Sequence, residues 1–106
     1  MSYYHIHGLI PDNLSQSDGY KLFENYINSG APKDNFDGFA IISRVHAPQT
    51  GEVFVTCLAD NHLKVDEHFA IWREKFGVEW NITPVLNDEE VIRRNNKLSN
   101  ELASME

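Results

Sequence analysis

The sequence predicts an α+β fold in which two strand–helix–strand units follow one another and a final helix is added. Three observations lead to this prediction. Alternating residues mark the strands, apolar residues at helical spacing mark the helices, and turn residues separate these segments. The first unit covers about residues 3–46 and the second about residues 52–86, so the order is βαββαβ followed by a helix.

The first unit begins with a strand and continues into an amphipathic helix. Residues 3–10 alternate in polarity, which is typical of a strand, and residues 11–13 form a turn cluster. A helix is expected over about residues 14–29, ended by Gly30. Its apolar stripe consists of Tyr20, Phe23 and Ile27.

Two adjacent strands are expected in the middle of the chain. Residues 39–45 and 53–58 are rich in apolar and branched side chains, and residues 47–51 between them form a reversal, so the two strands make a hairpin. Residues 33–37 before the hairpin are expected to be a polar loop. Because the hairpin is apolar on both faces, we expect both to be covered, one by helices and one by another surface.

The second unit repeats the pattern with stronger signals. Its helix is expected to begin after Asp60 or Asn61 and to end at Gly77, and residues 78–83 alternate as a fourth strand. Pro84 favours an edge strand, because proline cannot donate a ladder hydrogen bond. The apolar stripe of the helix is Val65, Phe69, Trp72 and Phe76.

The last helix has a clear start. Asn87 and Glu90 have the spacing of a capping box, and acidic residues fill the first turn. A narrow heptad-like stripe follows, interrupted by the polar Asn95. The stripe consists of Val91, Leu98, Leu102 and Met105.

Length and composition indicate one domain over residues 1–106, with a core at about 3–86 and the last helix at about 87–105. The single cysteine, Cys57, excludes an intrachain disulfide and is typical of a reducing compartment. Neither a secretory signal nor a membrane-spanning stretch is visible, so we expect a cytoplasmic location and no membrane partner. The net charge of −7 argues against nucleic acid as a partner.

Short motifs give this chain a resemblance to a known family. The segments Ser43-Arg44-Val45-His46 and Ile82-Thr83-Pro84-Val85, the second followed by Asp88-Glu89-Glu90, resemble those of the bacterial domain-of-unknown-function 3303 family, within the dimeric α+β-barrel superfamily. The resemblance implies a ferredoxin-like sheet with strand order 4-1-3-2, both main helices on one face and a second copy on the other. The family usually has tryptophan in place of Val45, and it assigns no catalytic residues.

Polar residues on alternate strand positions are expected to face the second copy. This set includes Tyr3, Thr56 and Thr83 in addition to the ligand candidates named below. The first and fourth strands would be neighbours about 4.8 Å apart. A polar cluster inside an apolar space is typical of a small-ligand site. The candidate ligand-binding residues are His5, His7, Arg44, His46, Glu79 and Asn81.

Other interpretations of these residues stay open. The histidines could be rim residues, and Arg44 with Glu79 could form an ion pair that fixes the dimer. A zinc site would need His5 and His7 together with His46 or Glu79, and we predict no metal. Haem beside His68 and Trp72 is possible by analogy with the fold, although core packing explains Trp72 better. The chain lacks a nucleophile elbow, a phosphate loop and a dinucleotide motif.

The sequence therefore predicts a cytoplasmic homodimer that binds a small organic molecule in a pocket between sheet and helices. If it is an enzyme, a monooxygenase or an isomerase would suit the fold by analogy, with His5, His7 or His46 as the base. The alternative is a non-catalytic interaction module that docks through the stripe of the last helix. The sequence identifies no cofactor, substrate or reaction.

Overall fold

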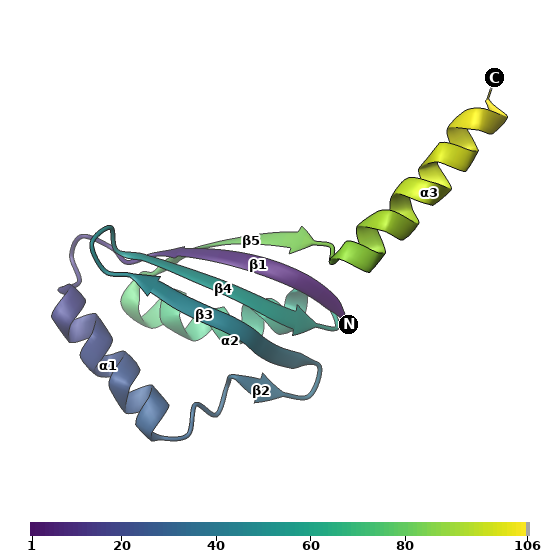
Figure 1. The fold of residues 1–106 in the computed structure, drawn as a ribbon. Helices are drawn as coiled ribbons and strands as arrows, with labels where there is room; N and C mark the ends of the chain where they lie inside the picture. Colours follow the sequence, from purple (N-terminus) through teal and green to yellow (C-terminus); the bar gives the residue numbers. More distant parts are fainter. Residues whose placement is uncertain (106) are drawn as a thin grey trace.

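The protein is described here from a computed structural model, in which residues 1–105 are placed. Strands and helices follow one another in the expected order, with one additional short strand (Figure 1). The elements are β1 (Ser2–Leu9), α1 (Gln16–Asn28), β2 (Asn35–Phe36), β3 (Phe39–Ala47), β4 (Glu52–Ala59), α2 (His62–Phe76), β5 (Glu79–Val85) and α3 (Asp88–Ser104).

The strands form one antiparallel sheet in the order β2-β3-β4-β1-β5. Without the short β2, this is the predicted ferredoxin-like order, so the fold prediction is confirmed. Residues 33–37 were expected to be a loop, but Asn35 and Phe36 pair with the start of β3. The strand β5 lies at the edge of the sheet, as Pro84 predicts.

Local signals place the helix ends correctly. The side chain of Ser15 caps α1, and Asn61 caps α2. Gly77 ends α2 in the left-handed conformation with φ of 73°. Asn87 and Glu90 form the complete capping box of α3. The capping predictions for α2 and α3 are therefore confirmed.

Both α1 and α2 lie on the same face of the sheet, which we call the helix face (Figure 1). The core lies between this face and α2, where Ile6, Phe39, Val65 and Phe69 are almost completely buried. Cys57 is also fully buried there, and burial raises the pKa of its thiol to about 12. Cys57 is therefore a small residue of the core.

An irregularity in β3 changes which residues face the helices. Ile41 pairs with Cys57 of β4, but the next residue of β4, Thr56, pairs with Ser43, so Ile42 is an extra residue in a β-bulge. After the bulge, Arg44 and His46 stand opposite the buried Val55 and Val53 on the helix face.

The prediction that Arg44 and His46 share a face with His5 and His7 is therefore wrong. It assumed uninterrupted alternation along β3, whereas one inserted residue moves every later side chain to the other face. The same shift turns Val45 to the face opposite the helices.

Two of the helices are less deeply packed than α2. Neither α1 nor α3 contains a buried residue, and α3 extends away from the sheet (Figure 1). Within residues 1–105, none of the helices combines the length and the apolar character that crossing a membrane requires.

Candidate functional site

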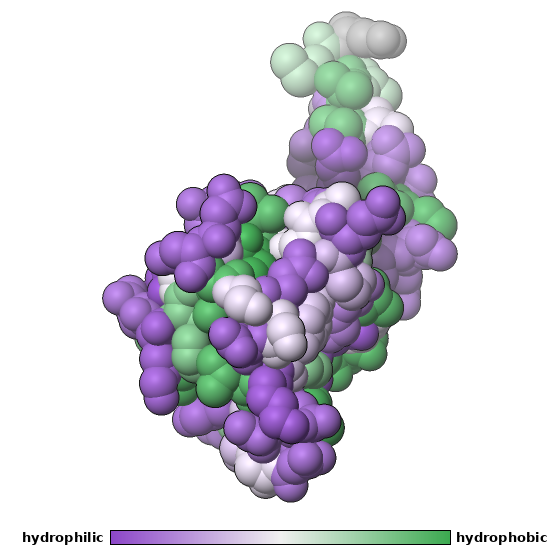
Figure 2. Space-filling view, turned by 90° about the vertical axis from the view of Figure 1, so that its left-hand side faces the viewer, coloured by the Kyte–Doolittle hydropathy of each residue, from purple (hydrophilic) through white to green (hydrophobic). Residues whose placement is uncertain are grey.

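A cavity lies between the helix face of the sheet and the two helices α1 and α2. It has a volume of about 70 Å³, opens to solvent, and is lined by residues of α1, α2 and the strands. Figure 2 shows hydrophobic side chains at the surface of the end of the body where α1 begins, between hydrophilic ones. Aromatic and imidazole rings form much of the lining: Tyr20, Phe23, His46, His68, Phe69, Trp72, Phe76 and Trp80.

One row of residues across the sheet forms the floor of this cavity. His46 of β3 pairs with Val53 of β4, which pairs with Gly8 of β1, which pairs with Trp80 of β5. Gly8 leaves the space that the indole fills, because a Cβ atom at this position would lie only 2.3 Å from Cζ3 of Trp80. The glycine therefore lets the Trp80 ring lie across β1.

The first helix encloses the other end of the row. The rings of Tyr20 and Phe23 contact the His46 imidazole edge to face, with ring centroids 5.3 and 5.1 Å away. On the opposite side, the ring of Phe69 from α2 packs 4.6 Å from that of Trp80. The cavity thus has flat aromatic walls with polar atoms set into them.

Three polar atoms of these walls are buried without a partner. The Tyr20 hydroxyl, Nδ1 of His46 and Nε1 of Trp80 find no hydrogen-bond partner within residues 1–105, and all three side chains line the cavity. A buried polar group without a hydrogen bond costs about 1–3 kcal/mol. Such groups are rare, and all three line one apolar cavity, where each is able to hydrogen-bond to a polar group.

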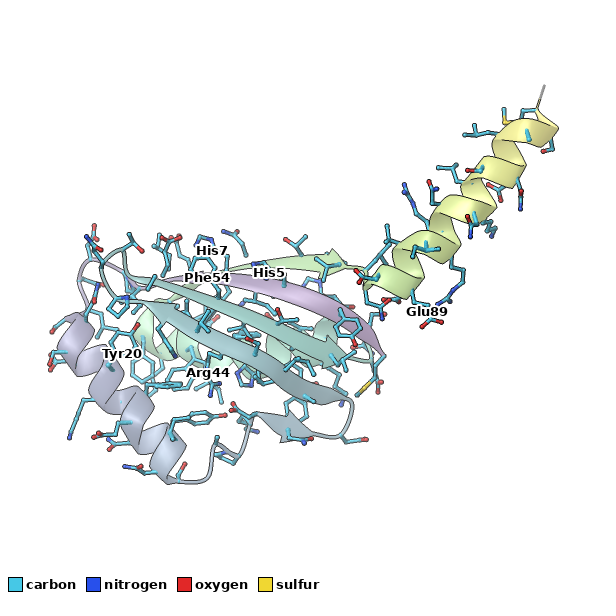
Figure 3. All side chains as sticks on the ribbon, in the orientation of Figure 1. His5, His7, Tyr20, Arg44, Phe54 and Glu89 are labelled. Carbon is cyan, nitrogen blue, oxygen red and sulfur yellow. The ribbon has the colours of Figure 1, made fainter. Side chains whose placement is uncertain are left out.

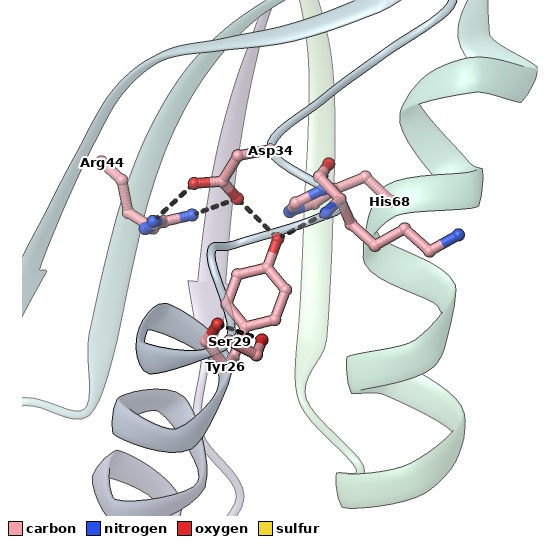
Figure 4. A network of polar contacts seen from close by, with 6 residues as sticks. Tyr26, Ser29, Asp34, Arg44 and His68 are labelled. Carbon is pink, nitrogen blue, oxygen red and sulfur yellow. Dashed lines mark hydrogen bonds and ion pairs between the residues drawn. The ribbon is translucent and has the colours of Figure 1, made fainter.

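A polar network closes the side of the cavity beside α1 (Figure 4). Arg44 donates two hydrogen bonds to the Asp34 carboxylate, from Nη1 at 3.0 Å and from Nη2 at 2.9 Å. The Tyr26 hydroxyl donates to Asp34 at 2.7 Å and accepts from the backbone N–H of Lys33. Nδ1 of His68 donates to the Lys33 carbonyl at 2.6 Å. This network joins α1, β3 and α2 through the connection before β3.

The titratable groups in the cavity wall favour uncharged forms. Burial lowers the pKa of His46, and the charge of Arg44 lowers it further. Burial also lowers the pKa of His68 and raises that of Tyr20. For Asp34, burial opposes ionisation, but the hydrogen bonds from Arg44 and Tyr26 and the Arg44 charge outweigh it and lower the pKa. The Asp34 carboxylate therefore neutralises the charge of Arg44, which is the one permanent cation of the lining.

The other four predicted ligand residues lie on the opposite face of the sheet, which we call the open face. Across β1 and β5, His5 pairs with Thr83, His7 with Asn81, and Leu9 with Glu79. Figure 3 shows His5, His7 and Phe54 on one side of the sheet, with Tyr20 and Arg44 on the other. The six predicted residues thus divide between two faces, with Arg44 and His46 in the cavity.

On the open face, His7 of β1 contacts residues of β4. Its Nε2 lies 2.6 Å from Oε2 of Glu52, and its ring stacks on Phe54. Hydrogen bonds from Thr50 and from His7 lower the pKa of Glu52. The suggested Arg44–Glu79 ion pair is wrong, because Arg44 binds Asp34 on the other face. Among residues 1–105, no group of three His, Cys, Asp or Glu side chains is arranged to hold a metal ion.

Sequence reasoning missed Tyr20 and Trp80 as site residues and considered His68 only beside haem. Tyr20 lies on the apolar stripe of α1, and Trp80 alternates with polar residues along β5, and both patterns are equally typical of core packing. A glycine in β1 was a possible signal, because glycine inside a strand often marks a close approach of another group. Its partner could be identified only once the register of β1 and β5 was known.

The sheet order, the two helices on one face and the cavity between them define the class: an α+β protein with a ferredoxin-like fold. The chain belongs to the family described as Domain of unknown function (DUF3303), whose model matches residues 1–99. The family prediction is therefore confirmed. No curated protein matches this chain.

One solved structure with a TM-score above 0.5 supports the fold, and two others with lower TM-scores are similar over most of the chain. Rv0793 from Mycobacterium tuberculosis is similar with a TM-score of 0.52 and 15% identity, over 83% of this chain and 98% of that one. The uncharacterized protein TM1266 from Thermotoga maritima gives 0.46 and 12%, over 80% and 98%. A protein from Deinococcus radiodurans, named as a candidate antibiotic biosynthesis monooxygenase, gives 0.47 and 16%, over 82% and 92%. At these identities the likeness concerns the fold alone.

Proposed function

We propose that this protein is a homodimer that binds a small organic molecule in the cavity between the sheet and its helices. The observation that carries the binding role is the set of three unpartnered polar atoms on Tyr20, His46 and Trp80. A ligand that hydrogen-bonds to them removes a cost that the folded chain otherwise bears. Of the three histidines predicted as bases, His46 is the one that lines the cavity, and we assign it to ligand binding.

The volume of the cavity limits the ligand. About 70 Å³ is less than half of the ~150 Å³ of a cavity that holds benzene, so a ring-sized ligand requires α1 to move outward. The structure supports such movement, because α1 buries none of its residues. The ligand is therefore small, and its binding stiffens the contact between α1 and the sheet.

The two tryptophans of the chain provide a direct test, since Trp72 and Trp80 both line the cavity. Saturable quenching of their fluorescence by p-cresol or p-xylene is expected for the wild type. Gly19→Phe places a ring into the cavity from α1 and should abolish the quenching. Ser17→Phe, on the exposed side of α1, is the matched control and should bind normally. Equal quenching in both variants would place the probe elsewhere.

The dimer part of the proposal is supported by the open face. Val45 is 56% exposed there, and it neighbours the half-buried Phe54 on β4. Exposed apolar side chains on a sheet favour coverage by another surface, and a second copy of the same face is the simplest cover. Native mass spectrometry should show a dimer for the wild type and a monomer for Val45→Asp. Ile71→Asp, at an exposed position of α2, should remain dimeric.

We place this function in the cytoplasm, because the only cysteine is buried and unpaired within residues 1–105.

A second candidate function is supported by α3. This helix extends from the body with no buried residue, and Leu98, Leu102 and Met105 are exposed along it. An amphipathic helix without a covered apolar face favours docking on a partner protein. If truncation after Asn87 leaves the dimer intact, α3 is available for a partner; if the dimer is lost, α3 belongs to the dimer interface.

A further inference from the structure

We infer that the ligand of the cavity is an uncharged aromatic molecule that carries at least one hydroxyl or carbonyl oxygen. This inference rests on the proposed binding function and names the class of ligand. It follows from three properties of the lining: the kind of hydrogen bond each unpartnered atom can make, the flat shape of the walls, and the compensation of charge.

The first property requires an oxygen on the ligand. Nε1 of the Trp80 indole is only a donor, so its partner must be an acceptor. The Tyr20 hydroxyl can both donate and accept, and Nδ1 of His46 can do either according to its tautomer. A phenolic or carbonyl oxygen satisfies the indole, and a hydroxyl group can also donate to His46. A pure hydrocarbon would leave all three atoms without a partner.

The second property favours a flat ring. The imidazole of His46 is held between the edges of Tyr20 and Phe23, and the ring of Trp80 covers Gly8. Aromatic rings prefer edge-to-face and offset-stacked neighbours, which these walls provide. The polar atoms are set in the planes of such rings, where they can reach substituents at the edge of a planar ligand.

The third property excludes a charged ligand. Arg44 is the one lining residue with a permanent charge, and its guanidinium is already bound to both oxygens of Asp34 and lies 4.8 Å from the centre of the Phe23 ring. The lowered pKa of His46 and the raised pKa of Tyr20 keep these two groups neutral near pH 7. A carboxylate on the ligand would therefore lose its hydration without gaining a free cation.

Three para-substituted toluenes test the inference by calorimetric titration of the full chain: p-cresol and p-xylene, which are nearly equal in size, and the somewhat larger p-toluate. A simple apolar pocket prefers p-xylene, because the hydroxyl of p-cresol must be dehydrated. We expect the opposite order here, with p-cresol at least tenfold tighter than p-xylene, because p-xylene leaves buried donors unpaired. We also expect p-toluate to bind at least tenfold more weakly than p-cresol.

Variants connect the preference to the named atoms. Tyr20→Phe removes one hydroxyl and keeps the ring, so it should reduce the p-cresol preference at least threefold while p-xylene binds as well as before. Tyr3→Phe, on β1 outside the cavity, is the matched control and should leave both affinities unchanged. An unchanged preference in Tyr20→Phe would remove this hydroxyl from the site.

The outcomes separate the two proposals. If p-xylene binds as tightly as p-cresol, the ligand class is wrong but the binding cavity stands. If p-toluate binds most tightly, the argument from charge is wrong. If none of the three probes binds, both the cavity function and the inference that rests on it are wrong.

Discussion

The Asp34–Arg44 ion pair should contribute strongly to stability because it stands at the centre of the network that holds α1 near the sheet. The carboxylate accepts two hydrogen bonds from Arg44 and one from Tyr26, and the two charged side chains are only 23% and 16% exposed. Removing one partner of a buried pair costs about 3–5 kcal/mol. Because both side chains keep some contact with water, we expect the lower end, about 3 kcal/mol, for Asp34→Ala.

The prediction becomes specific in a double-mutant cycle. Arg44→Met alone leaves the Asp34 charge without its main partner and should cost a similar amount. The double variant has neither charge, so its cost should be close to that of either single variant, and the coupling energy should be about 3 kcal/mol. Urea unfolding followed by circular dichroism gives each free energy, provided that the slope with denaturant is unchanged.

An exposed ion pair on α1 provides the control. Lys21 and Glu24 are joined by a hydrogen bond of 2.9 Å, but their side chains are 73% and 56% exposed. The cycle Lys21→Met and Glu24→Ala should therefore give a coupling of no more than about 0.5 kcal/mol. If the Asp34–Arg44 coupling is as small as this control, then the network is a surface feature and the reasoning about α1 is refuted.

Four further predictions follow from the same contacts. Asp34→Ala should also tighten the binding of p-toluate, measured by calorimetry, because it leaves Arg44 free to pair with a carboxylate. Gly8→Ala should lower the free energy of unfolding by about 1–3 kcal/mol in urea titrations, because its Cβ collides with Trp80. Truncation after Asn87 should change the unfolding free energy per monomer by less than about 0.5 kcal/mol, since α3 buries no residue. Urea titrations at several pH values should show two losses of stability. The free energy of unfolding should fall as the pH drops below 6.5, because the folded-state pKa values of His46 and His68 are lowered. It should fall again below pH 3.8, because the folded-state pKa of Asp34 is also lowered and its carboxylate is then protonated. The first of these losses should be smaller in His46→Gln, and a stability that is flat between about pH 7 and pH 5 would contradict the assignment.

The sequence predicted the elements well because their signals are local. A cap such as Asn61 or Asn87 acts within one helical turn, and Gly77 needs only its own left-handed backbone conformation to end α2. The sheet order followed from the order of elements together with the family resemblance. Each of these inferences uses residues close together in the chain or a pattern common to a whole class of folds.

The site could be predicted only in part because it depends on distant pairings. A single extra residue, Ile42, moved Arg44 and His46 to the other face, and nothing in the alternating pattern of β3 marks that insertion. The row from His46 to Trp80 requires three strand registers to be known at once. The alternation of residues along a strand divides its side chains between two faces. It does not show which of these faces lies on the same side of the sheet as a given face of the next strand.

The bulge in β3 also explains how one sheet can serve two proposed roles. Val45 and His46 are neighbours in the chain, yet they lie on opposite faces, one on the open face and the other in the cavity. Without the extra residue, His46 would lie on the same face as His5 and His7, and Val45 would lie on the helix face. Because the two faces use different side chains, dimer formation and ligand binding should be separable by substitution. Val45→Asp should therefore give a monomer that still binds p-cresol, and loss of both properties together would mean that the cavity takes its shape only in the dimer.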